Sequence, residues 1–367
     1  MSMDTDTGAD TSMTAKVLNN SRLYVISYAE SIIRDLITNL SCSTDYFDSY
    51  SHWGIHEEML KDEVRTLSYR DAIMQNPHLF RGKVVLDVGC GTGILSMFCA
   101  KAGAKHVYGI DMSNIIDKAK EIVKVNGLDD RVTLLKGKME DIQLPVAKVD
   151  IIVSEWMGYF LLYESMLDTV LYARDRYLAE DGLLFPDHAR ILVAAIEDSE
   201  YKEEKIGFWD DVYGFDFSPI KEDVWKEPLV DTVEAHAVNT NTCTVLDIDL
   251  KTVKKEDLSF QSSFQLTATR NDFIHGFLAW FDIDFSACHK PVHFSTGPFT
   301  NYTHWKQTVF YTRKNLTIKA GETLSGTISC KPAERNHRDL DINLSYTFNP
   351  TDSSRSAVSE NLFFRMC

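Results

Sequence analysis

Glu155 and Glu164 are the residues of this sequence with the clearest potential for chemistry. They lie nine residues apart and flank an apolar segment that contains Gly158. Two carboxylates that face one another in an apolar setting repel, which raises a pKa unless a cation lies between them. The spacing therefore predicts a loop that returns the second carboxylate to the first and holds a positively charged ligand. The alternative is a pair of unrelated surface glutamates.

A glycine-rich segment follows the first apolar run, Val84–Val88. Glycine is needed where a backbone turns sharply and approaches a ligand closely. Ile94 stands where a dinucleotide fingerprint would place a further glycine, and Asp111 follows Gly89 by 22 residues, where a carboxylate can accept both hydroxyl hydrogens of a ribose. These features favour an adenosyl cofactor with an unphosphorylated ribose. The alternatives are a turn that binds no ligand and an aspartate that only favours a nearby helix N-terminus. The glycines are Gly89, Gly91 and Gly93.

The segments that must position these groups alternate between strand and helix from Lys83 to Phe185. Short apolar runs are typical of buried parallel strands, and this order predicts a doubly wound α/β sheet with helices on both faces. Ligands of this architecture bind at the carboxyl edge of the sheet, where Glu155 follows a strand. The expected strands are 84–88, 106–110, 132–136, 149–154 and 182–185, and the expected helices are 94–102, 113–126 with Ser113 as N-cap, and 165–178.

The pattern changes after Pro186. Alternating apolar and polar residues there predict antiparallel strands and an all-β second domain. An aromatic-rich segment at Tyr201–Trp225 interrupts the strands, and such an insertion more often buries against something than stays exposed. The expected strands are 191–196, 244–250, 263–269, 277–285, 309–311 and 340–348.

Composition narrows the class of protein. A chain of 367 residues exceeds the size that one hydrophobic core usually organises, and no apolar run approaches the roughly 20 residues that span a bilayer. The net charge of −16 argues against direct nucleic-acid binding and suits a cationic partner, although solubility alone would also explain it. The seven cysteines form no CxxC pair, so we expect reduced thiols, no metal site and a soluble intracellular protein.

The N-terminal segment divides into two parts. Residues 1–16 are polar without an apolar period and predict a disordered tail. Residues 17–45 predict an amphipathic helix and a linker, with apolar residues at helical spacing up to Leu40. This helix would pack on its own protein or on a dimer mate, or it would make a separate regulatory contact.

From about Tyr46 to the C-terminus the sequence resembles the protein arginine methyltransferase family. The glycine loop alone is typical of methyltransferases in general, whereas Ser-Glu-Trp-Met-Gly-Tyr at 154–159 with its second glutamate is highly specific. The resemblance implies a Rossmann-like methyltransferase domain at 46–185, a β-barrel domain at 186–367 and a helical dimerisation arm at about 199–233. The segments that carry it are 46–50, 54–60, 64–70, the glycine loop, 154–159, 162–166 and Tyr-Thr-His-Trp at 302–305.

The resemblance also implies S-adenosylmethionine as the cofactor. Arg65 would pair with its methionyl carboxylate, which suits a planar guanidinium, and Glu140 would lie near the adenine amine. Asp111 departs from close relatives, which often carry glutamate, so the ribose contact is weakened or shifted. The residues expected to bind the cofactor are His56, Arg65, Gly89, Gly91, Asp111 and Glu140.

In the family, the cation between the two glutamates is an arginine guanidinium. The methyl donor is positive at sulfur, so the two carboxylates would compensate charge and concentrate positive charge away from the attacking nitrogen. Proximity and alignment would supply much of the remaining rate. His304 with Asp62 is the possible acceptor of the proton lost after transfer. Members that form asymmetric dimethylarginine have methionine at the Met59 position, so we expect monomethyl and asymmetric dimethyl products. The residues expected to shape the substrate pocket are Tyr50, Met59, Met166 and Trp305.

Two other readings stay open. A methyltransferase for another substrate class would have no role for Glu164, and an inactive arginine-motif binding module should have lost a glutamate or the glycine loop. By family analogy the expected partners are arginine/glycine-rich proteins, such as RNA-binding proteins and histone tails, and a second copy of the chain in a head-to-tail dimer or a larger oligomer. Direct nucleic-acid and membrane binding are not expected. The expected location is the nucleus and the cytoplasm.

Overall fold

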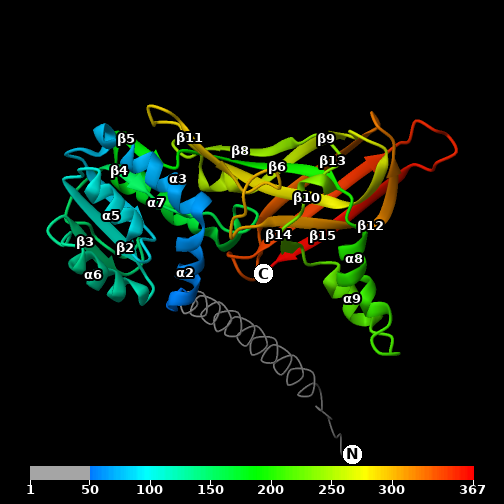
Figure 1. The fold of residues 1–367 in the computed structure, drawn as a ribbon, viewed down its shortest axis with the longest axis horizontal. Coiled ribbons are helices and arrows are strands. Elements are labelled where there is room, and N and C mark those ends of the chain that lie inside the picture. Colours follow the sequence, from blue (N-terminus) through cyan, green and yellow to red (C-terminus); the bar gives the residue numbers. More distant parts are fainter. Residues whose placement is uncertain (1–49) are drawn as a thin grey trace, which may run out of the picture. The chain divides into compact units, whose positions relative to one another are not determined.

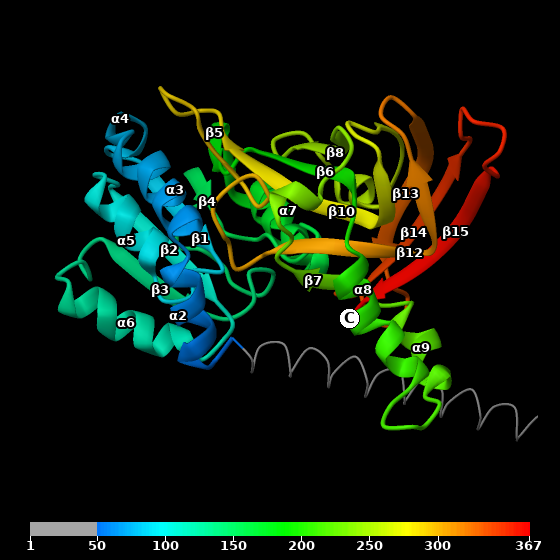
Figure 2. The same ribbon diagram turned by 45° about the vertical axis from the view of Figure 1, so that its right-hand side comes forward.

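The computed structural model describes residues 50–367, which belong to one compact unit, Asp48–Cys367. The expectations for the tail at 1–16 and for the helix and linker at 17–45 lie outside the described residues. Figures 1 and 2 show a parallel sheet with helices on it, followed along the chain by antiparallel sheets. Within residues 50–367, no helix has both the length and the apolar character to span a membrane.

The parallel sheet has five strands in the order β3-β2-β1-β4-β5. The strands β1 and β4 are almost completely buried because they have neighbours on both sides, which explains their continuous apolar sequence. The strand order reverses between β1 and β4, so the loops that follow these strands open at the position where such sheets bind ligands. The strands are β1 (Val84–Val88), β2 (His106–Asp111), β3 (Val132–Lys136), β4 (Val149–Val153) and β5 (Leu178–Phe185).

Of the described helices that precede β5, three follow the predicted pattern and three were not predicted. The expected N-cap at Ser113 is wrong: Asn114 occupies that position, and the Ser113 hydroxyl instead donates a hydrogen bond to Asp111. The predicted helices are α5 (Ile94–Lys101), α6 (Ile115–Val125) and α7 (Met166–Tyr177). The others are α2 (Trp53–Lys61), α3 (Glu63–Met74) and α4 (Pro77–Phe80).

The antiparallel part consists of two sheets. One has the order β7-β12-β10-β6-β8 with β11 paired to β10, and the other has the order β15-β14-β13-β9. Aromatic pairs join the two sheets, with ring centroids 5.0 Å apart for Phe310–Phe364 and 5.3 Å apart for Phe277–Tyr346. The strands are β6 (His188–Ile196), β7 (Leu229–Asp231), β8 (Cys243–Asp249), β9 (Phe260–Thr267), β10 (Asp272–Phe285), β11 (Val292–Ser295), β12 (Gln307–Ile318), β13 (Thr323–Pro332), β14 (Leu340–Phe348) and β15 (Val358–Met366). Four of these were not predicted, namely β7, β11, β13 and β15.

The change from parallel to antiparallel pairing occurs between Phe185 and His188, close to the expected boundary after residue 185. The hydrophobic core nevertheless continues across it. The ring of Tyr69 from α3 contacts Phe285 from β10, with centroids 4.9 Å apart, and Phe285 in turn lies beside Phe185. Both halves therefore pack into one body, which fixes the loops of one half against those of the other.

The aromatic segment forms an arm of short helices that leaves the antiparallel sheets at β6 and returns at β7 (Figures 1 and 2). It consists of α8 (Ser199–Lys205), η2 (Gly207–Asp210) and α9 (Ser218–Val224). Several of its large apolar side chains are exposed, with Tyr213 at 95% and Phe215 at 69%. The described part of this chain thus supplies no cover for the arm's aromatic face.

Candidate active site

The glycine loop turns at the carboxyl end of β1. Gly89 and Gly91 have φ of +73° and +51°, a region that other residues rarely adopt. The amide of Gly89 donates to the Ile110 carbonyl at 2.9 Å, which ties the loop to β2. A Cβ at Gly89 would lie 2.1 Å from the Met166 Cε. The positive φ therefore favours glycine at this position, and an added Cβ would also displace the end of the Met166 side chain.

Asp111 is held in place by its own neighbourhood. Its Oδ2 accepts a hydrogen bond from the Gly91 amide at 2.8 Å. Its Oδ1 accepts from the amide and the hydroxyl of Ser113 at 2.8 Å and 2.7 Å. A carboxylate oxygen can accept more than one hydrogen bond, so an oriented acceptor remains at the end of β2, as a ribose site needs.

Asp87 is a residue whose importance the sequence analysis missed. It lies in β1 and is fully buried, with Oδ2 accepting from the Ser96 hydroxyl at 2.6 Å and Oδ1 without a partner among the described residues. Burial raises the pKa of Asp87 to about 7, against the opposing effect of its hydrogen bonds with Ser96. A buried acceptor directly before the glycine loop fits a ligand that brings a hydrogen-bond donor. The available signal was a charged residue inside an apolar strand.

His56 and Glu140 differ in how far the structure connects them to this loop. A Cβ at Gly91 would lie 3.3 Å from the His56 ring, so α2 packs on the loop. The buried His56 ring also contacts the Tyr50 carbonyl through Nε2 at 2.9 Å. Glu140 is exposed, and its Oε1 accepts from the Thr169 hydroxyl on α7 at 3.0 Å. The glycines of positive φ and the Asp87 Oδ1, which has no partner among the described residues, fit an adenosyl cofactor that donates a hydrogen bond.

The segment between the two glutamates turns back on itself, and the expectation that the two carboxylates face one another stays a prediction. The Gly158 amide donates to the Leu161 carbonyl at 3.0 Å, and a Cβ at Gly158 would lie 2.1 Å from the Tyr163 carbonyl oxygen. Four non-glycine residues in the loop have positive φ: Phe160, Leu161, Glu164 and Ser165. Strain of this kind persists only where the surroundings impose it, and it is common at functional sites.

Glu155 forms a buried ion pair with Arg65. The Arg65 Nε lies 2.8 Å from the Glu155 Oε2, with side-chain exposures of 8% and 9%. The Arg65 Nη1 also donates to the Met59 carbonyl at 3.2 Å. Nothing in the structure tests the prediction that Arg65 binds the cofactor carboxylate. The pair does show that Arg65 compensates the charge of one of the two glutamates, which the sequence did not predict.

Tyr50 reaches the other glutamate. Its hydroxyl donates to the Glu164 Oε2 at 2.9 Å. Two residues of the α2–α3 region, Tyr50 and Arg65, thus contact one glutamate each. The same region also packs on the glycine loop through His56. It therefore contacts the glycine loop and both glutamates of the candidate site.

Asp62 brings together α2, α3 and the segment that carries His304. Its Oδ2 accepts from the His304 backbone amide at 2.9 Å and contacts the His304 Nδ1 at 2.7 Å. Its Oδ1 accepts from the Arg65 amide at 3.0 Å and so caps α3. Burial raises the pKa of Asp62, but the hydrogen bonds from His304 and Arg65 outweigh it, so the net pKa lies below its usual value. Asp62 therefore stays ionised and orients the imidazole.

The expected pocket residues separate into two groups. Tyr50 and Met166 contact Glu164 and the glycine loop, and Met59 contributes its carbonyl to Arg65. Trp305 does not fit its assignment as a pocket wall, because it is 3% exposed and stacks on Phe294. Its indole N–H donates to the Met157 carbonyl at 2.8 Å. Trp305 thus supports the glutamate loop from the core.

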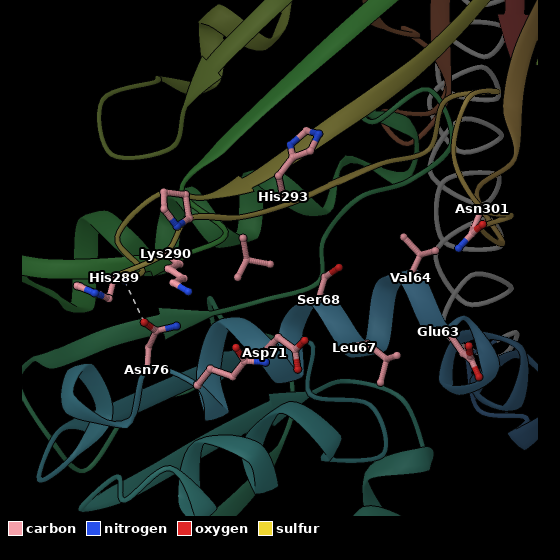
Figure 3. Close-up of a pocket in the computed structure, with 13 residues that line it drawn as sticks. Glu63, Val64, Leu67, Ser68, Asp71, Asn76, His289, Lys290, His293 and Asn301 are labelled. Atoms are coloured by element: carbon pink, nitrogen blue, oxygen red, sulfur yellow. Dashed lines mark hydrogen bonds between the residues drawn. The ribbon is translucent and has the colours of Figure 1, made fainter.

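A groove of about 700 Å³ runs along α3 and is separate from these residues (Figure 3). Residues of α3 form one side, and the segment around β11 forms the other. The His289 amide donates to the Asn76 side chain at 2.9 Å across its far end. The opposite end of the groove is formed by Glu63, the neighbour of Asp62, and by Asn301. The groove is lined by Glu63, Val64, Leu67, Ser68, Asp71, Gln75, Asn76, His289, Lys290, Pro291, Val292, His293 and Asn301.

Comparisons with known proteins agree with this geometry. Residues 85–182 match the model of a methyltransferase domain, and residues 187–352 match that of the arginine methyltransferase oligomerization subdomain. The chain is 78% identical over 330 residues to protein arginine N-methyltransferase 1 of Schizosaccharomyces pombe, covering 90% of this chain and 97% of the relative. It is 60% identical to the Saccharomyces cerevisiae protein of the same name over 87% of this chain and 93% of that one.

Solved structures lead to the same family. The Trypanosoma brucei PRMT1 enzyme–prozyme heterotetrameric complex with AdoHcy contains a chain with a TM-score of 0.83 and 50% identity, covering 87% of this chain and all of that one. Arabidopsis thaliana protein arginine methyltransferase 10 aligns with a TM-score of 0.78 and 31% identity, over 87% of this chain and 99% of that one. The chain described here belongs to the protein arginine N-methyltransferase family.

Proposed function

We propose that this chain is an S-adenosylmethionine-dependent protein arginine N-methyltransferase that forms monomethyl and asymmetric dimethylarginine. The observation that carries the proposal is the folded loop between Glu155 and Glu164. Contacts of neighbouring side chains connect this loop to the glycine loop on one side and to the Asp62–His304 pair on the other. Family membership at 78% identity supports the same reaction. The glycine loop and both glutamates are intact, unlike in the inactive binding module considered above.

The bound cofactor supplies a sulfonium methyl group to one guanidino nitrogen of the substrate arginine. Glu155 and Glu164 bind the guanidinium and offset the repulsion between two positive groups. Arg65 keeps Glu155 fixed, and Tyr50 keeps Glu164 fixed, through contacts of 2.8 Å and 2.9 Å. A preorganised site of this kind pays no reorganisation cost when the charge moves.

The methylated nitrogen must lose a proton. The His304 imidazole is the acceptor in this proposal, because Asp62 contacts its Nδ1 and leaves Nε2 available to take the proton. The ionised Asp62 then stabilises the imidazolium. Met59 and Met166 fit the asymmetric product, since the family members that make it carry methionine at the Met59 position.

The enzyme acts as a homo-oligomer in this proposal. The match to an oligomerization subdomain supports assembly, and the exposed Phe208, Tyr213 and Phe215 on the arm present an apolar face for a second copy. Light scattering tests this point. A purely monomeric and fully active enzyme would contradict it.

The proposal also covers the substrates of the enzyme and its location in the cell. The net charge of −16 favours cationic polypeptides, so we include arginine/glycine-rich RNA-binding proteins and histone tails as substrates in the nucleus and the cytoplasm. Microscopy of the tagged chain and mass spectrometry of its cellular products would test both.

The central experiment incubates the enzyme with labelled S-adenosylmethionine and an Arg-Gly-rich peptide. We expect transfer by the wild type and a loss of about 100-fold or more in Glu155→Gln and in Glu164→Gln, because each removes a charge aimed at the transition state. Unchanged transfer in either variant contradicts the charge mechanism. Symmetric dimethylarginine in the product spectrum contradicts the proposed product.

A further inference from the structure

Glu164 and the residue after it occupy a backbone conformation that their residue types disfavour. Glu164 has φ of +73° and Ser165 has φ of +57°. Neither is glycine, and two successive left-handed residues need surroundings that impose them. The contacts of this short stretch therefore determine where the Glu164 carboxylate points.

Tyr50 contacts the Glu164 carboxylate, whereas the peptide groups of Glu164 are held by the loop between β13 and β14, far away in the sequence. The Glu164 amide donates to the Arg338 carbonyl at 2.9 Å, and the Arg338 Nη1 donates to the Glu164 carbonyl at 2.8 Å. Arg338 thus binds both peptide groups of Glu164, the donor through its backbone and the acceptor through its guanidinium. The next residue is held in the same way, since the Ser165 hydroxyl donates to the His337 carbonyl at 2.5 Å.

The β13–β14 loop is itself well ordered by hydrogen bonds. The Asn336 side chain accepts from the Arg338 amide at 3.2 Å and donates to the Asp339 carboxylate at 2.8 Å. The Ala333 amide donates to the Asp339 carbonyl at 2.9 Å. Arg338 is therefore presented from a fixed loop of the antiparallel half.

A second set of contacts anchors the start of α7 to the same half. The Asp168 Oδ2 lies 2.7 Å from the His337 Nε2 and 2.8 Å from the Lys255 Nζ. Arg174, further along α7, donates to the carbonyls of Leu250 and Val253. The helix that follows Glu164 is thus attached along its length, so Arg338 acts on a segment with one end already fixed.

We propose that Arg338 is a positioning residue for the reaction, which holds Glu164 in its left-handed conformation so that the carboxylate meets the substrate guanidinium. The inference rests on the proposed function. It makes the antiparallel half a part of the catalytic geometry, since that half sets the orientation of a glutamate carried by the parallel half. It also predicts that Arg338 affects the arginine substrate and leaves the cofactor site unchanged.

The first test compares Arg338→Ala with Arg338→Lys and a matched control, Arg335→Ala. Arg335 lies in the same loop, is exposed and makes no hydrogen bond to Glu164 among the described residues. We expect Arg338→Ala to lower kcat/KM for an Arg-Gly-rich peptide about tenfold or more, as loss of a hydrogen bond to a charged donor does. Lysine should restore part of the loss, because it can still donate. Arg335→Ala should stay within about twofold of the wild type.

The second test separates positioning from general stability. The dissociation constant of S-adenosylhomocysteine, measured by calorimetry, should change less than about twofold in Arg338→Ala. Peptide affinity, measured by fluorescence anisotropy with saturating S-adenosylhomocysteine, should fall in Arg338→Ala and in Glu164→Gln. The double variant should bind the peptide no more weakly than Glu164→Gln alone, because both changes remove one interaction.

The contradicting outcomes distinguish an error in the positioning role of Arg338 from an error in the proposed function. Additive losses in the double variant, or equal behaviour of Arg338→Ala and Arg335→Ala, would overturn the positioning role while the wild type still transfers methyl groups. A weakened cofactor site in Arg338→Ala would also overturn it. A wild-type enzyme that transfers no methyl group would overturn the proposed function itself.

Discussion

Replacing Asp62 with asparagine should destabilise the protein at the point where α2, α3 and the His304 segment meet. The carboxylate accepts two hydrogen bonds from His304 and one from the Arg65 amide, and its side chain is 1% exposed. An asparagine that keeps the α3 cap directs its NH₂ group at the His304 amide, so that bond is lost, and the Nδ1–H bond is lost as well in the tautomer that the aspartate selects. Hydrogen bonds to a charged group contribute about 1.5–3 kcal/mol each. We expect a loss of about 3–6 kcal/mol in the free energy of unfolding.

The size of this loss should depend on pH. The pKa of Asp62 is lower in the folded protein than its usual value. Its stabilisation is therefore fully present above the unfolded pKa of about 3.9. It disappears as the pH falls through the folded value. The difference between wild type and Asp62→Asn should be constant from about pH 5 to 7 and shrink below about pH 4.

Urea denaturation at several pH values measures this difference, with Asp71→Asn as the control. Asp71 lies on the same helix and pairs with its neighbour Arg70 at the partly exposed surface, so its loss should cost less than about 1 kcal/mol. A cost below about 1 kcal/mol for Asp62→Asn at pH 7 would refute the reasoning. A difference that stays constant down to pH 3 would refute it as well.

Three further predictions concern the cofactor loop and its support. The pKa of Asp87 is raised from 3.8 to about 7, so the carboxylate destabilises the unliganded fold increasingly as pH rises from about 4 to 7, by about 4 kcal/mol for a shift of about three units. Unliganded Asp87→Asn should match the wild type in unfolding free energy near pH 4 and exceed it at pH 8. Equal unfolding free energies at both pH values would show that burial does not destabilise the Asp87 carboxylate. Gly89→Ala should weaken S-adenosylhomocysteine binding at least about tenfold in calorimetry, because its Cβ would lie 2.1 Å from the Met166 Cε at a φ of +73°. Unchanged binding would mean that the Met166 side chain moves away and that the loop tolerates alanine at this φ. Trp305→Phe should cost about 1–3 kcal/mol in urea denaturation, because the buried Met157 carbonyl loses its donor. A variant as stable as the wild type would show that water replaces the indole.

The parallel half of the fold could be predicted well from the sequence. Its central strands are buried on both sides, so their apolar runs stand out, and the glycines mark the turn after β1. The antiparallel strands were harder to find. In β13 (Thr323–Pro332) and β15 (Val358–Met366), exposed polar residues share the strand with the buried ones, and no long apolar run marks them.

The candidate site could be predicted only in part. Residue types and the family resemblance identified the two glutamates, the glycine loop and the Asp62–His304 pair. They did not identify the ion pair of Arg65 with Glu155, which joins residues 90 positions apart, or the contact of Arg338 with Glu164 across 174 positions. Such contacts depend on how the two halves pack, and no local pattern records them. Trp305 was misplaced for the same reason, since a motif does not show which way an indole faces.

If the cofactor carboxylate binds Arg65, as the family resemblance implies, the Arg65–Glu155 pair links the two ligand sites thermodynamically. A ligand carboxylate that approaches Arg65 competes with Glu155 for the same guanidinium and so changes the charge that Glu155 offers to a cation. Linkage requires the effect to be mutual: whatever cofactor occupancy does to peptide affinity, the peptide must do to cofactor affinity by the same factor. One buried arginine would then couple the binding of the two substrates.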